Sequence, residues 1–354
     1  MGENEDGEGG GHVRRKRYRG NHPRSFSEKY KERNPEAYRE DVDRVIARGD
    51  TPAGSHRAIL VREIMEILSP KPGETALDAT LGYGGHAGEI LKAILPGGRL
   101  IGMDRDEAEL AKTAERLRAG GVPDEAFTAV SGNFSGIARV LAEAGRSGVD
   151  LFLVDLGVSS MQIDDPARGF SFKRRGPLDM RMDPGHGMSA REYLAEASEE
   201  SLRAILELNA DEEGAAPIAH ALFLRRGSLA TTRDLAEAIV SAFPGLAFKD
   251  PAMARTLRRA FQAIRIEVNQ EFASLEALLT SLPACLNPGA RAAFLSFHSG
   301  EDRRVEAALG EGLAAGLYSK IAGEPIRPSK EERYGNPRSS SAKLRWAVRS
   351  GAHA

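Results

Sequence analysis

Residues 78–90 read DATLGYGGHAGEI, and this glycine-rich stretch decides the fold class. It lies between a short apolar segment of strand length and a segment with apolar residues at helical spacing. A glycine turn in that position brings the backbone, and the first turn of the helix, close to a ligand. The sequence therefore predicts a ligand site at the carboxyl end of a β-strand.

The segments around this turn predict an α/β fold. Short apolar segments alternate with amphipathic helical patterns from residue 59 to residue 157, which is typical of a parallel, doubly wound sheet. In such a sheet, ligands bind outside the carboxyl ends of the strands. The expected strands are 74–80, 99–104, 127–133, 151–157, 291–299 and 344–349, and the expected helices between the early strands are 59–68, 88–95, 107–119 and 137–145.

The alternation is interrupted after Ser160. Residues 161–189 are rich in Gly, Pro, Asp and Arg without a clear period, and helical patterns then follow one another. These patterns are 190–198, 200–209, 216–226, 232–243 and 253–282. We predict a sheet domain made of residues 51–163 and 262–354, an inserted, mainly helical domain of residues 164–261, and a basic, partly disordered extension of residues 1–50.

The overall composition limits the class of protein. A net charge of −2 creates no global attraction to nucleic acid or membranes, so such contacts need local clusters. RRKRYRG (residues 14–20) is one, and it suits either an arm on RNA phosphates or a solvated tail. The single cysteine, Cys285, can form no internal disulfide, and no apolar run reaches the roughly 20 residues of a membrane span. The expected location is the cytoplasm.

Asp78 discriminates between two ligands for the glycine turn. Gly82-Tyr-Gly84-Gly85-His-Ala87 satisfies the G-x-G-x-x-G/A pattern of NAD sites, but such turns also hold the methionine end of S-adenosylmethionine. A carboxylate beside the turn repels a pyrophosphate and attracts a sulfonium and an ammonium group. These residues favour S-adenosylmethionine, with an NAD-dependent oxidoreductase as the rival interpretation.

Two further strand ends fit a nucleoside. Asp104 ends the second expected strand, where an acidic residue can accept from the hydroxyls of a ribose, while Asp106 suits a helix N-cap. After the third strand, Asn133 could bond the adenine edge and Phe134 could cover its face. The alternative for Phe134 is a core position.

Five stretches, the glycine turn among them, are together more specific than that turn alone. They read DATLGYGGHAGEIL, MDRD, LVDLGVSSMQIDDPARGFSF, GPLDMRMD and FHSGEDRRVE. Together they resemble the bacterial 16S ribosomal RNA cytosine-N4 methyltransferase family, known as MraW or RsmH, over residues 55–349. The resemblance implies a Rossmann-like methyltransferase domain with an inserted helical substrate-recognition domain, S-adenosylmethionine as cofactor, and methylation of a cytidine N4 amine in the decoding region of 16S rRNA. Methylation of DNA or of another RNA, and an RNA-binding assembly factor with a relic cofactor fold, are the alternatives.

The resemblance also implies positions for the cofactor. They are Gly84, Gly85, His86, Asp104, Phe134, Asp155 and Gln162. One departure is Gly300 in FHSGED, where the family pattern leads us to expect a bulky apolar residue. The departure concerns the packing of that loop.

Asp155, at the end of the fourth strand, is the expected catalytic residue. Methyl transfer from a sulfonium needs no metal, only an amine in line with the S–CH3 bond at about 3 Å. The N4 lone pair is delocalised into the ring, and an acceptor that pulls on N4–H frees it. The alternative is that Asp155 only holds the methionine ammonium. Methylation at carbon requires a thiolate, and Cys285 is expected to be a buried apolar residue.

Local clusters of basic residues are the candidate RNA contacts. They are Lys173, Arg174 and Arg175 after the fourth strand, and Arg255, Arg258 and Arg259, with Arg265, on the last inserted helix. Spacings of three and four place several on one helical face, as phosphate contacts or as a salt-bridged solvent surface. For His298 at a strand end, contact with the RNA competes with a structural role. Met180 and Met182 are expected to be packing residues. Monomer and homodimer both stay open.

Overall fold

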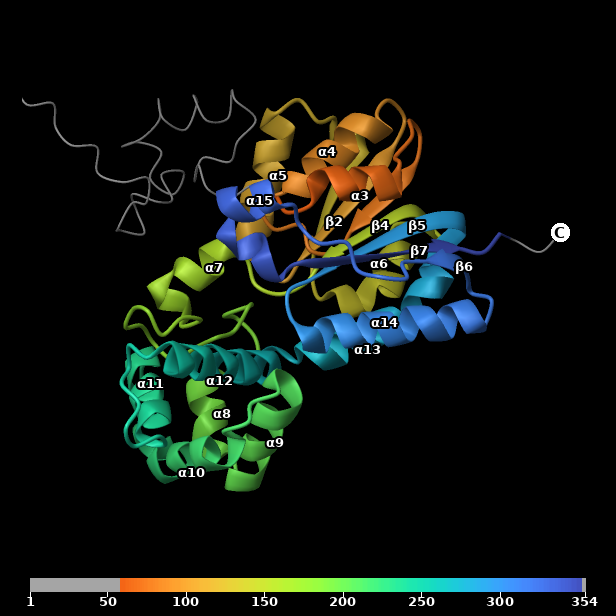
Figure 1. The fold of residues 1–354 in the computed structure, drawn as a ribbon. Coiled ribbons are helices and arrows are strands. Elements are labelled where there is room, and N and C mark those ends of the chain that lie inside the picture. The colour runs from red at the N-terminus through yellow and green to blue at the C-terminus, as the bar shows by residue number, and fades with distance from the viewer. Residues whose placement is uncertain (1–57, 352–354) are drawn as a thin grey trace, which may run out of the picture. The chain divides into compact units, whose positions relative to one another are not determined.

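The computed structural model describes residues 58–351 and centres on a seven-stranded sheet (Figure 1). The strands lie in the order β3-β2-β1-β4-β5-β7-β6. The first five pair in parallel, whereas β7 is antiparallel to both neighbours, so the predicted α/β class is confirmed. The strands are β1 Thr75–Asp78, β2 Arg99–Asp104, β3 Phe127–Ser131, β4 Val149–Asp155, β5 Leu286–Ser296, β6 Tyr318–Ile321 and β7 Lys343–Arg349.

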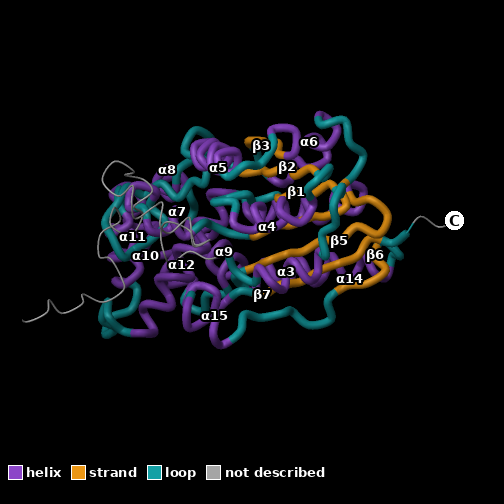
Figure 2. Tube along the Cα trace, turned by 90° about the horizontal axis from the view of Figure 1, so that it is seen from above, coloured by secondary structure: helices purple, strands orange, loops and turns teal. Residues whose placement is uncertain are grey.

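Helices cover both faces of the sheet (Figure 2). In β4, Leu151 and Leu153 share a core with α3, α4 and α5, whereas Phe152 and Val154 share one with α6, α13 and α14. Because side chains alternate between the faces of a strand, a continuous apolar run suits a strand buried on both sides. These helices are α3 Val61–Leu68, α4 Gly85–Ile94, α5 Glu107–Ala119, α6 Ile137–Glu143, α13 Glu271–Ser281 and α14 Ser299–Ala314.

A helical region between β4 and β5 has a hydrophobic core of its own, built from α8 to α12. Met180 and Met182 lie in this core, as predicted. The helices are α8 Ala190–Glu196, α9 Glu199–Ala210, α10 Ala215–Arg225, α11 Thr232–Ser241 and α12 Pro251–Asn269, and the short α7 Ser160–Asp164 precedes them. The expected domain boundary at residue 261 falls inside α12, and the division into domains stays a prediction.

Two elements differ from those expected. Residues 253–282, predicted as one helix, form α12 and α13, because Gln270 takes a left-handed conformation with a φ of 51°. The break lets α12 pack in the helical core and α13 pack on the sheet. The sequence pattern also missed β6, a four-residue edge strand that follows α14 and precedes α15 (Lys330–Gly335).

Some predictions concern parts of the chain that the structure does not reach. The basic run of residues 14–20 and the remainder of the extension up to residue 50 lie outside the described residues. Between residues 58 and 351, no helix combines the length and the apolar character that a membrane crossing requires.

Asn269, the last residue of α12, joins the helical region to two other segments. Its buried side chain accepts from Met182 N at 2.7 Å and donates to the carbonyl oxygens of Met180 at 2.7 Å and Arg265 at 2.9 Å. Its own carbonyl accepts from Arg105 Nη1 at 2.8 Å, just beyond β2. This residue therefore fixes the end of α12 against residues 180–182 and against the carboxyl end of the sheet.

We expect Asn269→Ala to lower the free energy of unfolding by about 2–4 kcal/mol, since truncation leaves the Met182 N–H and the Met180 carbonyl buried without partners. Asn209→Ala is the matched control, because that amide donates a single bond, to Ala263 O, from a partly buried position. Urea denaturation measures both. Equal losses for the two variants would contradict the role assigned to Asn269.

Candidate functional site

Three aspartates end neighbouring parallel strands at one edge of the sheet. Asp78 is the last residue of β1, Asp104 of β2 and Asp155 of β4. The register pairs Asp78 with Gly102 on one side and with Leu153 on the other, so the three strand ends are adjacent. Asp155 N also donates to Thr80 Oγ1 at 2.6 Å, which ties the end of β4 to the residues after β1.

Asp78 and Asp155 carry the strongest electrostatic signal at this edge. Burial raises the pKa of Asp78 to about 7, against a hydrogen bond from Thr80 N–H and with help from Asp104. Burial also raises the pKa of Asp155 to about 8, and the charges of Asp78 and Glu301 add to the effect. Within residues 58–351, neither carboxylate forms an ion pair with Lys or Arg. The Asp155 side chain is still 32% exposed, so a ligand can reach it.

His86 faces Asp155 from the first turn of α4. Its Nε2 lies 2.9 Å from Ile59 O, an acceptor, so Nε2 carries the proton and Nδ1 has a free lone pair. That Nδ1 lies 4.0 Å from Asp155 Oδ2. Burial lowers the pKa of His86 and so keeps its ring neutral. The ring therefore supplies no positive charge to the aspartates.

The glycine turn is fixed to the end of β2. Gly82 N donates to Asp104 Oδ2 at 2.8 Å, and Thr113 Oγ1 of α5 donates to Gly82 O at 2.6 Å. Gly84 has a φ of 79°, and a Cβ there would lie 2.8 Å from Thr113 Cγ2. A Cβ on Gly85 would lie 2.9 Å from that of Ala58. The packing of the turn alone therefore requires glycine at both positions, whether or not a ligand approaches the backbone there.

Asp104 retains acceptor capacity for a ribose. Its two oxygens accept one bond each, from Gly82 N and from Asp106 N, and each keeps a second lone pair. Burial raises the pKa of Asp104, although the two N–H donors oppose the shift. The N-cap of α5 is Asp106, which accepts from Glu109 N at 3.3 Å, as predicted.

The residues after β3 are already engaged within the protein. Asn133 Nδ2 donates to Ser274 Oγ at 2.8 Å and Oδ1 accepts from Ser135 N at 3.0 Å, so its amide does not extend freely towards an adenine. Phe134 opens a 3-10 turn and packs, partly buried, against the core between the sheet and α13. Its proposed contact with the cofactor stays a prediction.

Gln162 lies near the same edge, its side chain bonds within the protein, and its contact with the cofactor stays a prediction. It forms a capping box with Ser159 at the start of α7, and its Nε2 donates to Asp106 Oδ2 at 3.2 Å. The same oxygen accepts from Arg168 Nη1 at 2.6 Å, and the sequence analysis did not single out this ion pair. Arg168 also donates to the carbonyl oxygens of Arg181 and Met182, so it anchors the segment after β4 to the end of β2.

The basic candidates differ in how far they are exposed. Five are largely exposed or lie at the surface beside the helical region: Lys173, Arg174, Arg175, Arg255 and Arg258. Arg259 is partly exposed, and its Nη1 donates to Asp211 O at 3.2 Å. Arg265 does not belong to an exposed face, because its side chain is only 15% exposed and donates two hydrogen bonds to Glu271, at 2.7 and 2.9 Å.

His298 is the N-cap of α14, and Glu301, which was not among the expected site residues, lies in the first turn of the same helix, close enough for its charge to raise the pKa of Asp155. Glu301 is buried in the first turn of α14, and its Oε1 lies 3.9 Å from where a Cβ of Gly157 would stand. Gly300, the departure from the family pattern, also has a physical reason. A Cβ there would lie 2.5 Å from Phe272 Cζ, so the Phe272 ring fills the space that a bulky residue would need. Cys285 is buried, as expected.

This arrangement suits S-adenosylmethionine. The carboxyl groups of the buried Asp78 and the partly exposed Asp155 lack a cationic partner among the described residues, and the cofactor brings a sulfonium and an ammonium group. A pyrophosphate would add negative charge to the same place. Together with the 3-2-1-4-5-7-6 strand order, the site defines an S-adenosylmethionine-dependent methyltransferase.

Comparison with known proteins identifies the family. The model of the MraW methylase family matches residues 53–350, and the chain belongs to this family. "Ribosomal RNA small subunit methyltransferase H 1" of Lachnoclostridium phytofermentans is 46% identical over 344 residues, which cover 96% of this chain and 93% of that protein. "Ribosomal RNA small subunit methyltransferase H 2" of Alkaliphilus metalliredigens is 47% identical over 342 residues, or 95% and 97% of the two chains. The solved structure of TrmN from Thermus thermophilus aligns loosely, with a TM-score of 0.38 and 12% identity over 82% of this chain and 48% of its own.

The raised pKa values of Asp78 and Asp155 predict how stability depends on pH. Between about pH 4 and pH 8 the folded protein holds protons that the unfolded chain has released, so stability is lost as the pH rises through this window. We expect Asp155→Asn to melt at a higher temperature than the wild type at about pH 8, with an advantage that shrinks towards about pH 4.

Thermal unfolding over this pH range measures the effect. The control is Asp124→Asn, because the Asp124 carboxylate is exposed and pairs with Arg118 at the surface. This variant should show no pH-dependent gain in melting temperature. A gain for Asp155→Asn of the same size at both ends of the range would contradict the assigned cause.

Proposed function

We propose that this protein is a methyltransferase that transfers a methyl group from S-adenosylmethionine to the exocyclic N4 amine of a cytidine in the decoding region of 16S rRNA. The observation that supports this cofactor is the pair of carboxylates of Asp78 and Asp155, which has no cationic partner among the described residues. The RNA substrate is supported by the family and by relatives whose names are those of small-subunit ribosomal RNA methyltransferases. Such a substrate would place the enzyme in the cytoplasm.

The cofactor would bind across the carboxyl ends of β1, β2 and β4. Asp104 accepts from the ribose hydroxyls, the turn with Gly84, Gly85 and His86 receives the methionine part, and Phe134 covers the adenine. Gln162, whose amide donates to Asp106, is the remaining proposed contact with the cofactor. S-adenosylmethionine supplies an electrophilic methyl group on a positively charged sulfur, so the protein need only position the amine and handle its proton.

Asp155 handles the proton of the amine. Its carboxylate accepts a hydrogen bond from N4–H, which turns the nitrogen lone pair out of conjugation with the ring. When the N–CH3 bond forms and the S–CH3 bond breaks, N4 loses one proton, and Asp155 accepts it in its ionised form, which burial opposes in the free protein and the positive charge of the bound cofactor would favour. The alternative role, in which Asp155 holds the methionine ammonium, predicts a defect in cofactor binding instead of turnover.

The helical region is the proposed substrate-recognition domain. It follows directly on the segment after β4, and it carries exposed arginines on α12 as well as Lys173, Arg174 and Arg175 before α8. Cationic side chains at this surface would neutralise RNA phosphates and orient the small subunit over the site.

We expect deletion of the gene to remove N4-methylcytidine from small-subunit RNA, and wild-type protein to restore it. Asp155→Ala should fail to restore it, because the proton acceptor is lost. Nucleoside mass spectrometry of 16S rRNA measures the modification, and Asp124→Ala serves as the matched control on an exposed carboxylate. An unchanged level of N4-methylcytidine in the deletion strain would refute the proposed function.

We expect the double variant Arg255→Glu/Arg258→Glu to raise the KM for small subunits about tenfold or more, with little effect on cofactor affinity. The salt dependence of binding should weaken by about two charges, since each lost phosphate contact lowers the slope by about one. Arg203→Glu on α9 is the control, because that arginine already pairs with Glu207 on the same helix. Equal effects of the double variant and the control would exclude a specific RNA surface on α12.

A further inference from the structure

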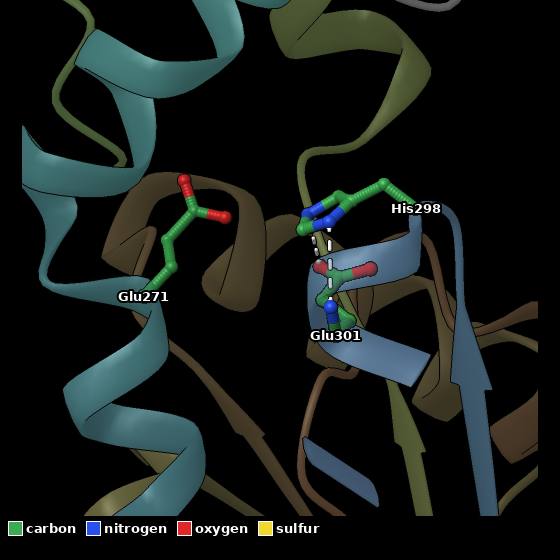
Figure 3. Close-up of side chains that lie close together, drawn as sticks. All are labelled: Glu271, His298 and Glu301. Carbon is green, nitrogen blue, oxygen red and sulfur yellow. Dashed lines mark hydrogen bonds and ion pairs between the residues drawn. The ribbon is translucent and has the colours of Figure 1, made fainter. Parts of the chain in front are cut away.

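Glu271, His298 and Glu301 form a cluster at the edge of the sheet (Figure 3). Glu271 begins α13, His298 is the N-cap of α14, and Glu301 lies in the first turn of that helix. One potential ligand atom from each residue lies within 4.8 Å of the others. Leu295 of β5 pairs with Asp155 of β4, His298 lies three residues after Leu295, and the charge of Glu301 is close enough to raise the pKa of Asp155.

The hydrogen bonds of His298 define which ring nitrogen carries the proton. Nδ1 accepts from Glu301 N, at 3.4 Å, in the N-cap of α14. In a neutral ring, Nε2 must then carry the hydrogen. Nε2 is buried and has no aligned hydrogen-bond partner among the described residues, although Glu301 Oε1 lies 3.2 Å away. Among the described residues, His298 Nε2–H therefore has one acceptor nearby, Glu301 Oε1, and is not aligned with it.

A divalent cation does not fit this cluster well. A metal would need a lone pair on Nε2, but the N-cap contact at Nδ1 places the hydrogen there. The carboxylate of Glu271 is already forked by the guanidinium of Arg265, which supplies its positive charge. The chemistry of the cluster is thus that of a hydrogen-bond donor held among paired charges.

Glu301 holds the ring of His298 in place. Its Oε2 accepts from Phe297 N at 2.8 Å, which fixes the carboxylate, and its Oε1 lies against the imidazole. Burial raises the pKa of Glu301, but His298, the Phe297 N–H and Arg265 together outweigh this and hold it below its ordinary value. A fixed, ionised Glu301 restrains the position of the His298 ring through the contact between Oε1 and Nε2.

We propose that His298 Nε2–H donates to N3 of the target cytosine while Asp155 accepts from its N4–H, with Glu301 as the positioning residue. This inference rests on the proposed function. N3 and N4 are neighbours on the Watson–Crick edge, which enzymes that act on an exposed base read by hydrogen bonds. Cytosine offers an acceptor at N3 next to a donor at N4, matching a donor at His298 next to an acceptor at Asp155. Uracil has an N3–H and would meet the His298 N–H with repulsion.

Three variants of His298 test this assignment on small subunits purified from the deletion strain. His298→Asn keeps an oxygen that can cap α14 but is too short to present a donor where Nε2 lies. His298→Gln can place an amide N–H near that position, and His298→Leu removes both functions. We expect kcat/KM to fall about tenfold or more for Asn and for Leu and to be largely retained for Gln, with cofactor affinity unchanged in all three.

The pattern separates recognition of the base from a purely structural role. Full activity of His298→Asn would show that only the helix cap matters and would overturn the proposal. Equal losses for Asn and Gln would do the same, as would stoichiometric binding of Mn²⁺ to the wild-type protein that Glu271→Gln abolishes. Because wild-type activity on the same subunits is measured in parallel, failure of the proposed function itself would appear separately, as absence of turnover in every sample.

Discussion

The site depends on two carboxylates, Asp78 and Asp155, that adjacent parallel strands bring together and that pair with no Lys or Arg within residues 58–351. Strand pairing fixes both backbones, so the side chains cannot separate, and burial makes ionisation of either one costly. This cost of ionisation falls at the edge where ligands of parallel sheets bind. A cationic cofactor relieves it, whereas an anionic dinucleotide would increase it. Sign of charge, more than the shape of the glycine turn, therefore selects the ligand.

The substrate side of the molecule is attached to this same edge. Arg168 reaches from the segment after β4 to Asp106, and Asn269 connects the end of α12 to Arg105. Both contacts meet the loop directly after β2, next to Asp104. Movement of the helical region relative to the sheet would therefore displace the loop at which the cofactor ribose is proposed to bind.

Local patterns in the sequence predicted the sheet, most of its helices and the aspartates at the strand ends, because periodicity and strand position are properties of neighbouring residues. Contacts between distant residues escaped prediction. Arg168 and Asp106 are 62 positions apart, and the residues around each of them give no sign that the two form an ion pair. The loss of Arg265 from the expected basic face has the same origin, since its partner Glu271 lies beyond a helix break that the left-handed Gln270 creates. Gly300 could be understood only once Phe272 was seen to occupy the missing side chain's space.

Proton release on cofactor binding tests the central claim most directly. Below about pH 7 the α-amino group of free S-adenosylmethionine is already protonated, so any protons released come from the protein. Titration calorimetry at about pH 6, in buffers with different ionisation enthalpies, counts them. The account predicts net proton release and an affinity that rises with pH, both reduced in Asp155→Asn. Binding heats that do not depend on the buffer, with an affinity that does not depend on pH, would contradict it.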